Sequence, residues 1–132
     1  MKVSEIPYVR VDVEEIKKVY EEQTEKILNS KSAAEVLAAR KTLLNAEVEL
    51  TTASSLSYMR WSCNTKDEFY KGEKEYYENQ LPLLSGAQIA YMKAMLQTPF
   101  RAEVEKALPA PIYKSYEVSL KALDERVVDE LR

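Results

Sequence analysis

The chain has 132 residues, of which 45% are apolar and 31% charged, a balance typical of one soluble globular domain. It contains no histidine and one cysteine, Cys63, which excludes histidine-dependent nucleophile pairs, an internal disulfide and a Cys/His zinc site. The net charge of -3 argues against nucleic-acid binding, and no run approaches the roughly 18 apolar residues of a membrane span. We therefore expect no catalytic, cofactor-binding or metal-binding residue here, no nucleic-acid or membrane partner, and a cytoplasmic chain with a reduced thiol.

Helical periodicity begins at once and has clear start signals. Three capping boxes, each a capping residue followed three positions later by glutamate, are Asp12 with Glu15, Ser32 with Glu35, and Thr65 with Glu68. The first two predict helices over 13–28 and 33–62, with Leu28 on the apolar stripe of the first and Val48 and Met59 on that of the second.

Small hydroxyl-bearing residues cluster in the later half of the second predicted helix, between Thr51 and Ser57. They predict close packing of a neighbouring helix, with hydroxyls bonding back to the preceding turn. The alternative is that they line a polar groove.

The third predicted helix, which starts at the Thr65 cap, repeats aromatic pairs one heptad apart. The pairs are Phe69–Tyr70 and Tyr76–Tyr77, and of these Tyr70, Tyr76 and Tyr77 are predicted to pack as a half-buried core with their hydroxyls reaching solvent. Pro82 should kink or end this helix near Gln80, because proline lacks the backbone amide that the helix needs.

Three further helical stretches complete the chain, and the first of them carries Ile89, Met92, Met95 and Leu96 on its apolar stripe. Thr98–Pro99 predicts a capped short helix through about Lys106. The last stripe extends from Ile112 to Leu131, with Asp124 as a candidate second cap. The whole sequence predicts a single all-α domain over 1–132, an antiparallel helical bundle or hairpin array of about five to seven helices.

The stretch Tyr58, Arg60 and Trp61 is the candidate contact site for a partner or peptide. It places a cation and the only tryptophan near a helix end, a combination common in recognition surfaces. Packing against the next helix is the alternative. Acidic pairs such as Asp67–Glu68 lie at helix starts, where they stabilise the helix dipole.

Three blocks of the sequence, in this order and spacing, resemble the N-terminal region of the oligoendopeptidase F family, zinc metallopeptidases related to thimet oligopeptidase. The blocks are MKVSEIPYVRVDVEEIK at the start, RWSCNTKDEFYKGE from Arg60 to Glu73, and TPFRAEVE from Thr98 to Glu105. The family commonly has isoleucine and aspartate where this chain has Cys63 and Asn64, and proline where it has Val11.

The resemblance implies the N-terminal, channel-wall segment of a larger enzyme that hydrolyses short peptides with zinc, which polarises the scissile carbonyl and its bound water. The family's His-Glu-x-x-His helix has no counterpart here, so this segment itself should be inactive and hold no zinc. Its expected partners are the remainder of the parent polypeptide and, through it, short peptides. The alternatives are a free-standing helical interaction or scaffold module, and a small enzyme that uses tyrosine and carboxylates alone.

A final stripe that continues to the last residue also predicts a segment of a longer protein. Apolar side chains that would meet the remainder should then be exposed and favour self-association. The candidates are Tyr58, Trp61, Leu120, Leu123, Val127 and Leu131.

Overall fold

The computed structural model describes the backbone of residues 2–130 and the side chains of residues 2–123. In chain order its elements are η1 (Val3–Glu5), α1 (Val13–Leu28), α2 (Ala33–Cys63), α3 (Glu68–Gln80), η2 (Leu81–Leu84), α4 (Ser85–Gln97), α5 (Arg101–Ala107) and α6 (Pro111–Glu130). Within residues 2–130 there is no strand, which confirms the predicted all-α class. The six α-helices of this range fall within the predicted number.

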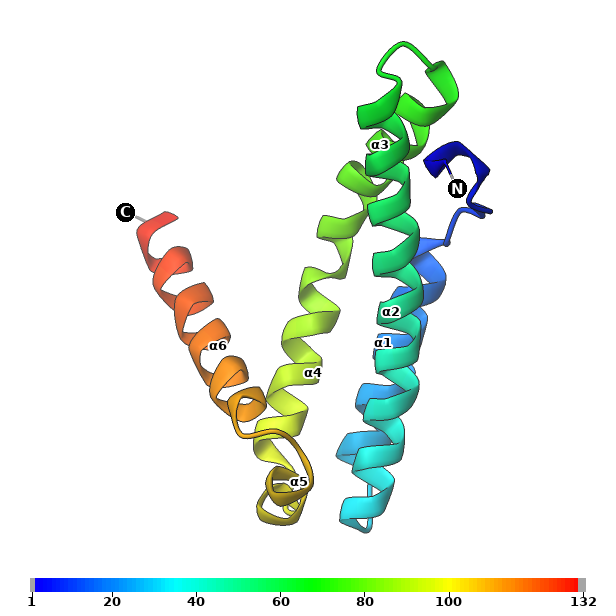
Figure 1. Ribbon diagram of the computed structural model, residues 1–132. Coiled ribbons are helices and arrows are strands. Elements are labelled where there is room, and N and C mark those ends of the chain that lie inside the picture. Colours follow the sequence, from blue (N-terminus) through cyan, green and yellow to red (C-terminus); the bar gives the residue numbers. More distant parts are fainter. Residues whose placement is uncertain (1, 131–132) are drawn as a thin grey trace.

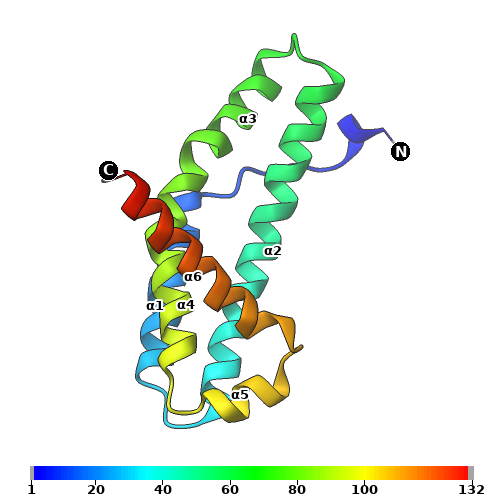
Figure 2. The ribbon, with the colours of Figure 1, turned by 90° about the vertical axis from the view of Figure 1, so that its left-hand side faces the viewer.

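The helices form hairpins and one kinked rod (Figures 1 and 2). α1 and α2 are antiparallel neighbours, α1 also packs against α4, and α3 returns along the second half of α2. Pro82 lies in η2, and α3 ends at Gln80 as predicted, but α4 runs on in roughly the direction of α3. α6 packs against α4 and diverges from α2, so the molecule is V-shaped in Figure 1.

The core lies between α1, α2 and α4, with further residues from η2, α5 and α6, and along α1 and α2 it largely follows the predicted stripes. Its largest fully buried side chains are Val13, Tyr20, Ile27, Val36, Leu43, Leu84, Met95, Val104 and Tyr113. The prediction is wrong for three residues of the stripes, because the side chains of Leu28, Val48 and Met59 are 62%, 64% and 45% exposed. Leu28 is the last residue of α1, and the buried positions of α2 recur every seven residues at Val36, Leu43 and Leu50, which turns Val48 outward.

The predicted caps are correct for α1 and α2, where the Asp12 and Ser32 side chains accept amide hydrogens from Glu14 and Glu35 at 2.9 and 3.3 Å. The cap of α3 is Asp67 rather than Thr65: its carboxylate accepts the Tyr70 amide at 3.0 Å. A carboxylate near the start of a helix also stabilises the helix dipole, which a threonine hydroxyl does not.

The later helices show two more departures. α5 begins at Arg101, because the hydroxyl of the buried Thr98 accepts the Phe100 amide and holds a turn where the first helical residue was expected. The backbone of α6 is helical through Asp124, so no second start occurs there, while the side chain of Asp124 lies outside the described residues.

Candidate functional site

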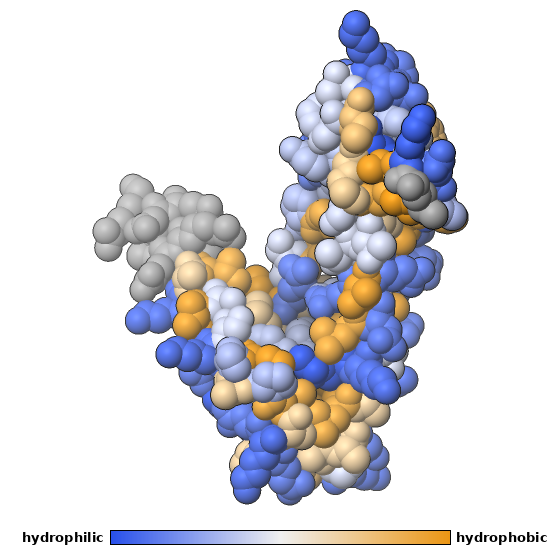
Figure 3. All heavy atoms as spheres, in the orientation of Figure 1, coloured by the Kyte–Doolittle hydropathy of each residue, from blue (hydrophilic) through white to orange (hydrophobic). Residues whose placement is uncertain are grey.

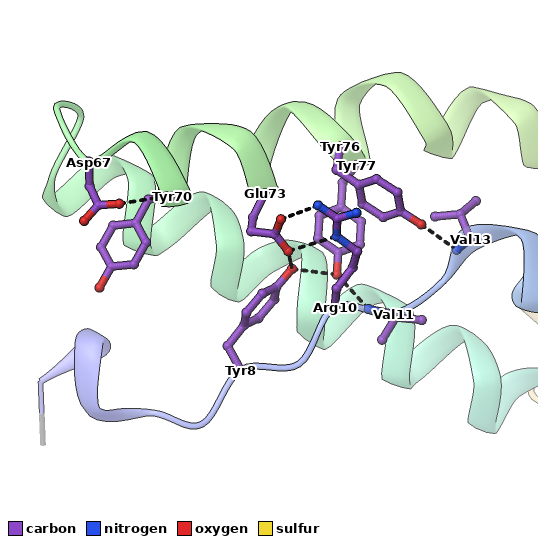
Figure 4. A network of polar contacts seen from close by, with 9 residues as sticks. All are labelled: Tyr8, Arg10, Val11, Val13, Asp67, Tyr70, Glu73, Tyr76 and Tyr77. Carbon is purple, nitrogen blue, oxygen red and sulfur yellow. Dashed lines mark hydrogen bonds and ion pairs between the residues drawn. The ribbon is translucent and has the colours of Figure 1, made fainter.

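The N-terminal segment before α1 is tied to α3 through a buried glutamate (Figure 4). Glu73 is 6% exposed, and its carboxylate accepts hydrogen bonds from the Tyr8 hydroxyl at 2.8 Å and from Arg10 Nε at 3.0 Å. A second Arg10 nitrogen, Nη2, forms an ion pair with the other carboxylate oxygen. Because Arg10 is the strongest influence, the pKa of Glu73 is lowered.

Two tyrosines of α3 extend this contact. The Tyr76 and Tyr77 hydroxyls accept the backbone amides of Val13 and Val11, both at 3.0 Å, and the Tyr77 hydroxyl lies 3.0 Å from that of Tyr8. The prediction that these hydroxyls reach solvent is therefore wrong. They satisfy amides at the start of α1 that have no partner within the helix, across at least 63 residues of sequence.

This cluster of tyrosines and a glutamate does not have the features of a carboxylate-based active site. Such a site needs a carboxyl group whose pKa is raised and a cavity that admits a substrate. Arg10 instead lowers the pKa of Glu73, and burial together with hydrogen bonds to Tyr77 and Glu73 raises the pKa of Tyr8. The space beside these side chains is too small to admit a ligand, with a cavity volume of about 0 Å³. The cluster fastens the N-terminal segment to α3.

The same cluster predicts a pH dependence of stability. The folded pKa of Glu73 lies below its ordinary 4.5, so its contribution is present above pH 4.5 and is lost as the pH falls through the folded value. We expect the difference in unfolding free energy between the wild-type chain and a Glu73→Gln variant to shrink as the pH falls below 4.5. Urea unfolding at several pH values measures it, and a difference that stays constant would contradict the assignment.

The structure separates the three candidate contact residues. Arg60 turns inward, donates a hydrogen bond to the Ile6 carbonyl, and lies over the rings of Tyr8 and Tyr70 at 5.3 and 5.6 Å. Tyr58 is 55% exposed and its ring centroid is 5.7 Å from that of the half-buried Trp61. Arg60 thus holds the N-terminal segment, whereas Tyr58 and Trp61 remain at the surface.

Trp61 also packs against the next helix, as the alternative interpretation expected. The Lys74 ammonium of α3 lies 4.0 Å from the Trp61 ring centroid and forms an ion pair with Glu78 at 2.7 Å. Of the other residues proposed as an exposed face, Leu120 and Leu123 are half-buried, and Val127 and Leu131 lie outside the described side chains.

Beside these residues a groove follows the junction of α2 with α3, η2 and α4. Two hollows of about 570 and 400 Å³ share Ser54, Tyr77, Glu78 and Leu81, and we call the two together the α2–α3 groove. The larger hollow is also lined by Glu47, and the smaller one by Tyr58. Figure 3 also shows a separate notch between the arm of α6, on the left, and the taller part of the molecule on the right; no described residue of α6 lines either hollow of the groove.

Both interpretations of the hydroxyl-rich stretch of α2 hold, and Ser54 satisfies both of them. The Ser54 and Ser57 hydroxyls donate to the carbonyls of Thr51 and Ser54 at 3.2 and 2.7 Å, so they bond back to the preceding turn. Ser57 is buried with Ala53, while Thr51 and Ser54 also line the groove. The sequence contained the signal for this groove but not the residues across it.

The side chains of residues 2–123 do not form a metal centre. Within the described side chains, no three His, Cys, Asp or Glu residues lie close enough to hold a metal ion. Cys63 is exposed at the end of α2. No helix in the described part of the chain is long and apolar enough to cross a membrane.

Comparison with known proteins decides the family. A family model described as the Peptidase M3 N-terminal domain matches residues 3–123, almost the whole chain. This chain belongs to that family. The resemblance of its three sequence blocks to the N-terminal region of oligoendopeptidase F is thereby confirmed.

Solved structures agree with the M3 N-terminal domain assignment. PZ peptidase A, determined with an inhibitor, is 27% identical with a TM-score of 0.84, and the match covers 91% of this chain and 21% of that chain. An oligoendopeptidase F from Bacillus anthracis str. Ames is 28% identical with a TM-score of 0.82, and the match covers 89% of this chain and 22% of that chain. Another oligoendopeptidase F is 30% identical with a TM-score of 0.84, and the match covers 92% of this chain and 21% of that chain.

The M3 N-terminal domain thus spans about a fifth of the length of the solved chains that it matches. No curated protein sequence matches it. Two of the three resembling blocks meet in the structure, because Tyr8 and Arg10 of the first contact Glu73 of the second.

Proposed function

We propose that this domain forms part of the channel wall of a zinc-dependent oligopeptidase that hydrolyses short peptides in the cytoplasm. The observation that carries the proposal is the family match over residues 3–123, together with structural likeness to oligoendopeptidase F. A surface hollowed by the α2–α3 groove suits a wall that limits access to a peptide channel.

Catalysis and zinc binding are assigned to the remainder of the parent polypeptide. This chain has no histidine, and the zinc ligands that the family requires cannot come from its residues. What this domain contributes is shape and contact surface. Tyr58 and Trp61, beside the smaller hollow, are the side chains proposed to contact a peptide or the remainder of the enzyme.

The partner surface follows from the same proposal. The exposed apolar side chains Val48, Tyr58 and Met59 lie on α2, and burial against the remainder of the parent would remove them from water. In its absence, a second copy of the domain could cover them, which is the self-association expected from the sequence.

The coding region beyond Arg132 provides the direct test of this function. We expect it to encode a His-Glu-x-x-His motif downstream, and a stop codon directly after Arg132 would contradict the proposal in favour of a free-standing helical module.

The purified 132-residue chain should carry no stoichiometric zinc by elemental analysis and should cleave a quenched short peptide only at the background rate. About one tightly bound zinc per chain would contradict the assignment of the metal to the remainder of the parent.

A further inference from the structure

Glu47 on α2 is a half-buried carboxylate in the larger hollow of the α2–α3 groove. It makes no hydrogen bond or ion pair with any residue that the structure describes, and burial raises its pKa. The other carboxylate of this hollow, Glu78, is already paired with Lys74 at 2.7 Å. Glu47 is therefore the charge in the groove that lacks a partner within the described part of the chain.

The walls around Glu47 are mainly apolar. Leu50, Leu81 and Leu84 line the same hollow of about 570 Å³, together with the hydroxyl-bearing Thr51 and Ser54. Leu50 and Leu84 belong to the core and form the floor, whereas Leu81 is half-buried and still accessible. A group that fits this arrangement has an aliphatic stem to lie against this apolar wall and a cation at its end to meet the carboxylate. Lysine and arginine side chains have this construction, whereas an amino terminus carries its charge directly on the backbone.

We propose that the larger hollow of the α2–α3 groove binds a lysine or arginine side chain of a peptide, with Glu47 as the acceptor of its charge. The inference rests on the proposed channel-wall function, in which that peptide is the substrate of the parent enzyme. Glu47 is a specificity-determining residue in this arrangement, because it binds a side chain of the peptide and not the bond that the parent enzyme cleaves. The ion pair would lie in a partly desolvated site, where charge-assisted hydrogen bonds are stronger than at an open surface.

The test is a nuclear magnetic resonance titration of the isotope-labelled 132-residue chain with short peptides that are blocked at both ends. One peptide has a central lysine in an alanine background, and its matched partner has norleucine at that position. We expect the lysine peptide to shift amide resonances around Glu47 and Leu84 and to bind about tenfold more tightly than the norleucine peptide. A Glu47→Gln variant should lose this preference.

The control variant is Glu49→Gln, which makes the same charge change at an exposed position of the same helix. It should keep the preference within about twofold, since exposed ion pairs contribute little. Equal binding of the two peptides by the wild-type chain, or an unchanged preference in Glu47→Gln, would overturn the proposal. So would equally tight binding of a norleucine peptide with a free amino terminus, which would assign the site to that group instead.

These outcomes are independent of the peptidase assignment. A coding region without the His-Glu-x-x-His motif would remove the channel-wall function and leave the Glu47-dependent preference to be measured on this chain. Conversely, a parent peptidase could be confirmed while the titration shows no preference for lysine.

Discussion

Replacing Leu43 with alanine should lower the free energy of unfolding by about 2–5 kcal/mol. Leu43 is 1% exposed at the centre of α2, where it belongs to the core cluster shared with α1 and α4. Truncation removes its buried methyl groups from the apolar environment and leaves a cavity that rigid neighbouring helices can fill only in part. Urea unfolding followed by far-UV circular dichroism measures the loss.

The matched control is Leu28→Ala, the same chemical change at a position that is 62% exposed at the end of α1. Its effect should stay within about 0.5 kcal/mol, because little apolar surface there is removed from water on folding. Similar losses for Leu28→Ala and Leu43→Ala would mean that the core does not lie where the structure places it.

Replacing Glu73 with glutamine should lower the free energy of unfolding by about 2 kcal/mol at neutral pH. Glutamine keeps the size of the side chain but removes the charge that pairs with Arg10 and accepts the Tyr8 hydroxyl. Because Arg10 is 50% exposed, water replaces part of the lost interaction, and the loss should be smaller than for a fully buried ion pair.

Glu75→Gln controls for the change of net charge, since Glu75 is exposed on the same helix. We expect it to be near neutral. Proteolysis adds a local measurement: with Glu73→Gln the segment before α1 should be cleaved faster than in the wild-type chain, while α2 stays protected. Equal stability of the Glu73 and Glu75 variants would show that the contact between Arg10 and Glu73 does not hold the segment.

The sequence alone determined the class of the fold and most helix boundaries, because these depend on neighbours a few residues apart. Asp12 and Ser32 cap the helices they were expected to cap, and Pro82 ends α3, since caps and proline act on the backbone within one turn. Where two residues within one turn can both serve as a cap, the local pattern does not distinguish them: it predicted Thr65 for α3, whereas the structure has Asp67.

Only the tertiary structure decided which polar side chains meet one another across the helices. Arg60 was grouped with Tyr58 and Trp61 by sequence proximity, but its guanidinium points to the Ile6 carbonyl, 54 residues away. The Tyr76 and Tyr77 hydroxyls accept amides at or just before the start of α1, and Glu47 acquires much of its apolar surroundings from η2. The physical reason is that a helical pattern specifies which face is buried but not which distant polar group meets it, because that depends on how the helices pack.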